Sequence, residues 1–300
     1  MAPAERTIIM FIPVLVGGLV LGCTYGMLAL GYSLIYQASG YMNFTQPDLL
    51  MFGAFVGLTF FDSMSLPFLI ALIASLAVMF IIGRMYERAF IRTLVKKKAK
   101  NIYIVLATIA LSIILQNAAM LLWDSRQHAF PSIFPGVNAI SIGSASVQPE
   151  SLLAIAVSVV AMVGLHMFLN RTKFGTAMRA SAQNKIAANV MGINVWMTIS
   201  VTYGIAAALA CLGGIIVAPS LGISMNLGSQ LGTKSFAAAV VGGYGNMYGA
   251  IVGALLIGLI ETFTAAYIGS VYKDFIVYFL LIAMLAFKPT GIFNAKVYDT

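Results

Sequence analysis

The sequence predicts an all-α integral membrane protein of about eight transmembrane helices, some of them broken or half-spanning. Of its 300 residues, 61% are hydrophobic and 9% are charged, whereas about 25% of the residues in a soluble domain are charged. The apolar residues form long runs, and the 28 glycines favour close packing of membrane helices. Lipid must therefore cover much of the surface, because so few charged residues cannot form a polar shell.

Apolar runs long enough for a hydrocarbon core of about 30 Å define the expected helices. In chain order they cover residues 8–36, 47–61, 67–83, 103–123, 152–169, 197–219, a broken stretch over 235–267, and 275–287. The second run is short and follows the polar stretch 40–46, so we expect a half-helix there. A single transmembrane domain, residues 1–300, accounts for the whole sequence.

Two basic segments set the orientation. Residues 84–101 carry seven positive charges against Glu87, and residues 171–195 carry four positive charges and no acid. Both lie between apolar runs, which is the pattern of cytoplasmic loops. Residues 124–151 are therefore expected outside. The net charge of +8 follows from these loops, and we expect no nucleic-acid partner.

The C-terminal part predicts a broken span. Lys288 and Lys296 favour a cytoplasmic C-terminus, which requires an even number of crossings after residue 195. The count works only if the short segment 235–243 crosses together with the irregular chain before it. Such backbone survives at membrane depth only where protein buries it or water lines it, and transporters place their substrates at broken spans.

The sequence lacks the motifs of a membrane enzyme. Residues 242–246 are glycine-rich, but no Lys-Ser/Thr follows, so we expect no ATP or other cofactor bound by this chain. His128 and His166 have no catalytic or metal-ligand partner at useful spacing, and Cys23 and Cys211 lie in apolar runs. We therefore expect no catalytic residue and no metal site.

Two acidic residues fall at membrane depth, where charge is expensive. Asp48 follows Pro47, and an acid in the first turn is also ordinary helix-start chemistry. Glu261 either pairs with a neighbouring helix or contacts a ligand. Neither belongs to a chain of acids suited to a proton relay.

The cytoplasmic segment 171–195 predicts one or two short helices that end at Gly192. Its alanine-rich, small face would let a partner approach closely, and Arg179 and Lys185 could fix the orientation of that partner. A solvated basic loop explains the composition equally well.

Short motifs recur in order along nearly the whole chain. They are G-x-x-Y-G-x-x-A-L-G-Y-S-L-I-Y over 22–36, G-Y-M-N-F over 40–44, M-x-G-A over 51–54, R-T-x-x-G-x-A-x-R-A over 171–180, G-G-x-G-N-x-x-G-A over 242–250 and K-P-x-G-I-F over 288–293. Together they resemble the LivH-type permease subunits of branched-chain amino acid ABC importers. The chain departs from the family pattern at Pro47, where many relatives have glycine.

This resemblance implies a set of partners. Two cytoplasmic ATPase subunits, which bind the ATP, would dock on the loop 171–195, and a second related permease subunit would complete the pore. A periplasmic solute-binding protein would deliver the solute near residues 124–151 and 221–234, and lipid would surround the chain in the bacterial inner membrane. The motif positions assigned to ATPase docking are Gly175, Ala177, Arg179, Ala180 and Gly192.

We therefore expect a permease subunit that imports branched-chain or related hydrophobic amino acids. The expected pathway residues flank the two interrupted segments: Asn43, Phe44, Thr45, Gln46, Asp48, Gly242, Gly243 and Asn246. Urea or a short amide is an alternative solute within the family. An ATPase-independent secondary transporter or channel, and more distantly a scaffold for other membrane proteins, remain the alternatives from other classes.

Overall fold

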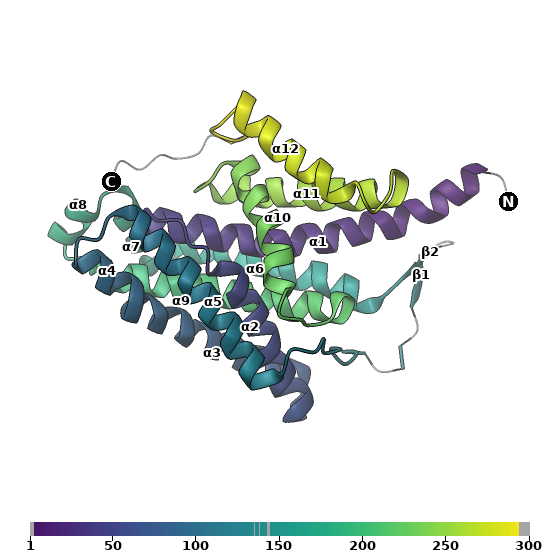
Figure 1. Ribbon diagram of the computed structural model, residues 1–300, viewed down its shortest axis with the longest axis horizontal. Coiled ribbons are helices and arrows are strands. Elements are labelled where there is room, and N and C mark those ends of the chain that lie inside the picture. Colours follow the sequence, from purple (N-terminus) through teal and green to yellow (C-terminus); the bar gives the residue numbers. More distant parts are fainter. Residues whose placement is uncertain (1–2, 135, 138, 143–144, 294–300) are drawn as a thin grey trace.

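The computed structural model describes residues 3–134, 136–137, 139–142 and 145–293. Figure 1 shows an elongated bundle of helices in which α1 (Pro3–Ser39) runs along the length of the molecule. A small antiparallel hairpin, β1 (Ile140–Ile142) with β2 (Ala145–Val147), lies at one end. The predicted all-α class is therefore confirmed.

Most of the other helices follow the predicted apolar runs, and three short ones lie in the two basic segments. They are α2 (Gln46–Leu58), α3 (Phe68–Tyr86), α4 (Arg92–Lys96), α5 (Asn101–Trp123), α6 (Pro149–Arg171), α7 (Lys173–Gln183), α8 (Lys185–Val190), α9 (Val195–Leu221), α10 (Leu227–Gly242), α11 (Met247–Tyr267) and α12 (Lys273–Phe287). Two π-helical turns, η1 (Thr59–Ser63) and η2 (Glu87–Ile91), continue α2 and α3 without a break. The segment 84–101, expected as a loop, is thus mostly helical, because no glycine or proline follows Gly83 to end α3.

Six helical segments of the described chain are long and apolar enough to cross a membrane. The remaining apolar helices α2, α10 and α12 contain 13, 16 and 15 residues. At a rise of 1.5 Å per residue, α10 and α12 reach only about 22–24 Å of a core about 30 Å thick, and α2 together with its continuation η1 reaches about 27 Å. The expectation of short and broken segments is confirmed, whereas eight full crossings are not.

Helix α9 forms the centre of the bundle, and 83% of its most apolar 18-residue segment is buried. Glycines let other helices of the bundle approach each other closely. Helices α1 and α11 cross at Gly22 and Gly258, where a Cβ added to Gly258 would lie 2.3 Å from the Gly22 nitrogen. Small residues at such crossings allow backbone contact between membrane helices.

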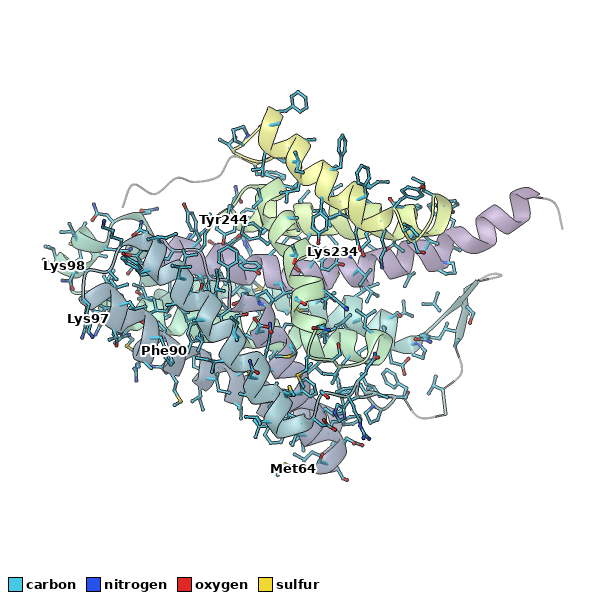
Figure 2. The ribbon with its side chains drawn as sticks, viewed as in Figure 1. Met64, Phe90, Lys97, Lys98, Lys234 and Tyr244 are labelled. Carbon is cyan, nitrogen blue, oxygen red and sulfur yellow. The ribbon has the colours of Figure 1, made fainter. Side chains whose placement is uncertain are left out.

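The two ends of the bundle differ in charge. Helices α4, α7 and α8 lie at the end that carries Lys97 and Lys98, which is the cytoplasmic end by the positive-inside rule (Figure 2). Helix α1 begins at the opposite, external end, beside the hairpin (Figure 1). After α12 the chain bonds to the end of α10, with Ile292 N donating to Val241 O at 2.9 Å. Lys296 lies outside the described residues.

Candidate functional site

Helix α2 begins inside the membrane. The Gln46 side chain, at its first residue, donates from Nε2 to the carbonyl of Ala206 at 2.8 Å. Ala206 lies eleven residues into α9, about 16 Å from its cytoplasmic end at the helical rise of 1.5 Å per residue. The half-helix expected after the polar stretch 40–46 is therefore present.

The second interrupted segment is α10. Helix α9 ends at Leu221, and α10 starts at Leu227 after a short irregular stretch. Figure 1 shows α10 standing steeply across α1 near the middle of the bundle. The broken span begins eight residues earlier than Ser235, because the polar residues 229–235 are helical despite their low hydropathy.

The two interrupted segments meet at Pro47. A Cβ added to Gly228 would lie 2.6 Å from Pro47 O, and one added to Gly232 would lie 2.3 Å from Pro47 Cγ. Gly228 and Gly232 form a small-xxx-small pair, which provides a notch for a neighbouring backbone. The sequence analysis missed this contact, although the G-x-x-x-G spacing was a readable signal for it.

The polar stretch before α2 is fixed by hydrogen bonds to two long helices. Asn43 Nδ2 donates to the hydroxyl of Tyr86 at 2.7 Å, and its Oδ1 accepts from Thr45 N at 3.2 Å. Thr45 Oγ1 donates to the Thr108 carbonyl at 2.8 Å, and Phe44 N donates to Thr108 Oγ1 at 3.1 Å. Asn43, Thr45 and Gln46 are buried, so this part of the predicted pathway is held rigidly inside the chain.

Asp48 attaches α2 to α5. Its carboxylate accepts a hydrogen bond from Ser112 Oγ and another from Gln116 Nε2, the latter at 2.8 Å. A buried carboxylate with two donors is a satisfied group, and here it binds the half-helix to a neighbour rather than extending into open space.

Aromatic rings connect the segment 43–48 with the segment 242–246. The ring of Phe44 lies 5.8 Å from that of Phe236 on α10. The ring centroid of Phe236 lies 5.7 Å from that of Tyr244, and the ring centroid of Tyr244 lies 4.9 Å from that of Tyr36 of α1. The two groups of predicted pathway residues are thus joined through one aromatic cluster, defined here as Tyr36, Phe44, Phe236 and Tyr244.

Gly242, Gly243 and Asn246 form the turn between α10 and α11. A Cβ on Gly242 would lie 1.9 Å from the carbonyl oxygen of Gly249, and Gly243 has a positive φ of 113°. Asn246 caps α11 by accepting from Tyr248 N at 3.1 Å and Gly249 N at 3.3 Å. These residue types are therefore required by the backbone of the turn itself.

One face of α10 is polar and exposed at membrane depth. Ser229, Gln230 and Thr233 are exposed, while Phe236 and Val240 are half-buried further along the same face. The 229, 233, 236, 240 spacing places these side chains in a row along the helix. Exposed polar side chains on a helix in the membrane interior normally face a cavity or another protein rather than lipid.

Helix α10 also carries a buried ammonium group, four residues after Gln230, that the sequence analysis did not single out. Lys234 Nζ lies 2.5 Å from Glu261 Oε1 on α11 and 2.7 Å from Asp274 Oδ1 on α12. Tyr25 of α1 donates to Glu261 Oε2 at 2.7 Å. Glu261 thus pairs with neighbouring helices, which is one of the two roles expected for it. Figure 2 shows Lys234 at the middle of α10.

The cytoplasmic segment 171–195 folds as the two short helices α7 and α8, as predicted. Thr172 and Asn184 cap them, accepting from Gly175 N at 3.0 Å and Ala187 N at 2.9 Å. Gly192 has a positive φ of 82°, as a helix-stop glycine requires.

The predicted docking residues divide into contact and exposed positions. Gly175 packs against the end of α6, where an added Cβ would lie 2.4 Å from Phe168 O. Ala177 and Ala180 are half-buried, while Arg179 is exposed and donates to Asn170 Oδ1 at 2.8 Å. The loop is therefore a structured surface, tied to the helices on both sides of it.

The remaining groups considered from the sequence are the two histidines and the two cysteines. His166 lies near Tyr248, with Nδ1 and the hydroxyl 3.2 Å apart, and His128 contacts the Trp123 carbonyl at 2.7 Å. Cys23 and Cys211 are buried and unpaired. Within the described ranges no group of three or more His, Cys, Asp or Glu side chains could hold a metal ion.

Residues 14–285 match the family model described as the branched-chain amino acid transport system permease component. The chain is 36% identical to the high-affinity branched-chain amino acid transport permease BraD of Pseudomonas aeruginosa, over 93% of this chain and 94% of the relative. It is 31% identical to LivH of Escherichia coli over 94% and 95%, and 28% identical to a probable LivH of Methanocaldococcus jannaschii over 93% and 91%. The chain therefore belongs to the family of permease components of branched-chain amino acid transport systems.

Proposed function

We propose that this chain is a transmembrane permease subunit of an ATP-binding-cassette importer for branched-chain or related hydrophobic amino acids. Its membership of the permease family carries this proposal, since the relatives named above are transport permeases over nearly their whole length. The chain is a multi-pass protein of the inner membrane, and its role is to form a pathway rather than to perform covalent chemistry.

The pathway runs along the exposed face of α10. Ser229, Gln230 and Thr233 offer hydroxyl and amide groups to the polar part of a solute, and Phe236 with Phe44 offers an aromatic wall to an aliphatic side chain. The buried groups of residues 43–48 and of the turn 242–246 hold the two ends of this face in place. A mixed polar and aromatic surface of this kind fits an amino acid with an apolar side chain.

Partner subunits complete the importer. Helices α7 and α8 form the docking surface for a cytoplasmic ATPase, and the exposed face of α10 meets a second, related permease subunit across the pore. ATP is bound by the ATPases, and a periplasmic binding protein delivers the solute at the external end. Movement of an ATPase reaches the transmembrane helices directly, because α7 is joined to α6 at Thr172 and bonded to α9 through Ser181 and Thr198, whose hydroxyls lie 3.2 Å apart.

The test is uptake of labelled leucine, isoleucine and valine by a transport-null strain that carries the complete system. We expect saturable, ATP-dependent uptake that unlabelled branched-chain amino acids compete away and urea or acetamide does not. Gln230→Ala and Phe236→Ala should raise KM for leucine, while an exposed lipid-side change such as Leu121→Ala should not. No uptake of any of the three amino acids, or competition by urea alone, would contradict the proposed solute.

A second set of variants tests the polar segment before α2 and the turn between α10 and α11. Asn43→Ala and Asn246→Ala remove the side-chain bonds described above, and we expect reduced uptake with the protein still inserted in the membrane. Unchanged uptake kinetics in both variants would remove these residues from the pathway.

A further inference from the structure

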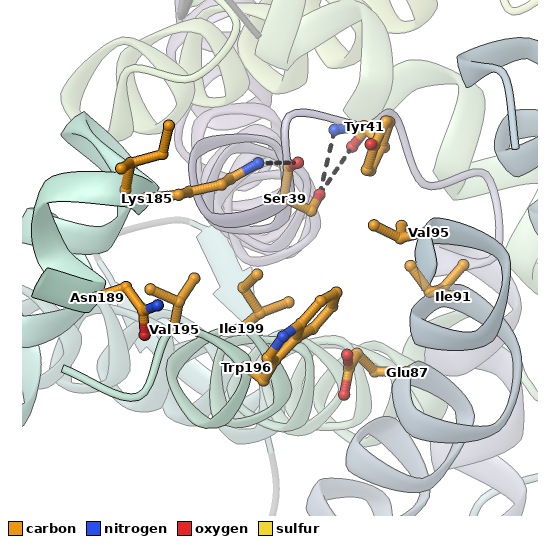
Figure 3. Close-up of a pocket in the computed structure, with 11 residues that line it drawn as sticks. Ser39, Tyr41, Glu87, Ile91, Val95, Lys185, Asn189, Val195, Trp196 and Ile199 are labelled. Atoms are coloured by element: carbon orange, nitrogen blue, oxygen red, sulfur yellow. Dashed lines mark hydrogen bonds between the residues drawn. The ribbon is translucent and has the colours of Figure 1, made fainter. Parts of the chain in front are cut away.

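A cavity of about 390 Å³ opens at the cytoplasmic end of the bundle, away from the face of α10. Its walls are the end of α1, η2 with α4, helix α8 and the start of α9 (Figure 3). This volume falls within the range of about 300–1,000 Å³ that is typical of small-molecule sites. Nothing in the proposed transport pathway uses this cavity.

Most of the lining is apolar, with two aromatic side chains. Aliphatic residues line it from four elements: Ile91, Val95, Ile186, Val195 and Ile199. Tyr41 and Trp196 add their rings, and Figure 3 shows Trp196 beside the centre of the space. Such a lining would bury a branched aliphatic group of a ligand.

One cation and one carboxylate lie on opposite sides of this lining (Figure 3). Lys185 of α8 folds inward, and its Nζ donates to the Ser39 carbonyl at 2.8 Å. This bond uses one of its three donors. Burial lowers the pKa of Lys185, so an anion placed next to this ammonium would relieve its loss of hydration.

The carboxylate is Glu87, whose side chain is fully buried. Arg92 holds it with two bonds, from Nε to Oε1 at 3.1 Å and from Nη2 to Oε2 at 2.9 Å. With no exposed side-chain surface and both oxygens bonded to Arg92, Glu87 forms a buried ion pair in the wall of the cavity. Arg92 also lies over the Trp196 ring, 5.3 Å from its centroid, and so fixes the wall on this side.

We propose that this cavity binds a small apolar amino acid, with its carboxylate at Lys185 and its side chain against Ile91 and Ile199. The inference rests on the proposed function, since an importer of such amino acids releases them on this side of the membrane. The cavity is then a product site.

A ligand in this position joins helix α8 to α4 and α9. Helix α8 belongs to the segment proposed as the ATPase-docking surface, so occupancy opposes the movement of that segment during transport. Accumulated product therefore slows further uptake.

The two tryptophans of the chain allow a direct binding test. The full-length protein is labelled with 5-fluorotryptophan, and its two ¹⁹F resonances are assigned with Trp196→Phe. Trp196 lines the cavity, whereas Trp123 packs against Phe52 and Phe55 at the far end of α5 and serves as the internal reference. We expect L-leucine to shift the Trp196 resonance in a saturable manner while the Trp123 resonance stays in place.

Ligand analogues and one variant locate the bound groups. Isopentylamine, which lacks the carboxylate, should bind more weakly than leucine, whereas 4-methylpentanoate, which keeps the carboxylate, should still bind. Lys185→Met should weaken leucine binding about tenfold or more, the effect of losing a charged hydrogen bond. Lys173→Met, a change of an exposed lysine in the neighbouring helix α7, should leave binding unchanged. Absence of a Trp196 shift, or equal binding of leucine and isopentylamine, would overturn the site.

Transport in proteoliposomes tests the consequence. Leucine loaded on the cytoplasmic side should inhibit uptake by the wild type, and Lys185→Met should reduce that inhibition relative to its own uninhibited rate. Inhibition that is identical in both proteins would overturn the feedback role. If the complete system imports none of the three branched-chain amino acids yet leucine still shifts Trp196, the proposed function fails and the binding site stands.

Discussion

The ion cluster on α10 gives the sharpest test of how this fold is held together. The change Lys234→Met removes the ammonium between Glu261 and Asp274, which lie 2.5 and 2.7 Å away. Methionine keeps a similar length and apolar stem. Glu261 would then retain the Tyr25 hydroxyl at 2.7 Å and the more distant Lys273 at 4.0 Å.

The burial of Glu261 and of Asp274 determines how much stability the Lys234→Met change removes. The Glu261 side chain is 4% exposed and that of Asp274 is 54% exposed. Removing one partner from a buried ion pair destabilises a protein by about 3–5 kcal/mol, because the other charge is left without compensation. The exposed partner contributes only about 0–1 kcal/mol. We therefore expect Lys234→Met to lower the free energy of unfolding by about 3–5 kcal/mol, nearly all of it through Glu261.

The assay is unfolding of the purified chain in bilayer-like discs by steric trapping, for the single changes and for Lys234→Met with Glu261→Gln. The double variant should be less destabilised than the sum of the single ones, because it leaves no unpaired buried charge. Asp274→Asn and Lys273→Met are the matched controls and should each change stability by about 1 kcal/mol or less. A Lys234→Met effect below about 1 kcal/mol, or an Asp274→Asn effect as large as it, would refute the assignment of stability to the buried pair.

Three further expectations follow from contacts of the two interrupted segments and of the docking helices. Gly232→Ala should destabilise the chain by about 1–3 kcal/mol through overpacking against Pro47, and adding Pro47→Gly should restore stability. Gly164→Ala is the neutral control, because an added Cβ there meets no atom within 4 Å. Thermal unfolding measures all three, and an equal effect of the two alanines would contradict the close contact between Gly232 and Pro47. Asp48→Ala should lower stability by about 1–3 kcal/mol, because it removes two hydrogen bonds from the half-buried donors Ser112 and Gln116. No change in the free energy of unfolding would show that these bonds do not stabilise the chain. Arg179→Glu should uncouple ATP hydrolysis from uptake while the protein still inserts, since a charge reversal opposes an acidic docking pocket more than neutralisation does; unchanged assembly and uptake would reject this role.

The sequence alone determined the membrane class and the order of the membrane helices, and it predicts the orientation. Long apolar runs and basic loops act through the bilayer, and these signals are local in the chain. The half-helix after residue 45 and the break near residue 235 were also readable, because short or interrupted apolar runs cannot span the core. The helix-stop role of Gly192 followed from the same kind of local signal.

The tertiary structure decided which side chains meet. Pro47 fits the notch at Gly228 and Gly232, and Lys234 pairs with Glu261 and Asp274, through contacts between residues far apart in the chain. Such pairings depend on helix rotation and depth, which packing sets and periodicity in a uniformly apolar helix does not reveal. For the same reason the sequence predicted the segments 43–48 and 242–246 as pathway residues, but it did not predict that the polar face of α10 lies between them.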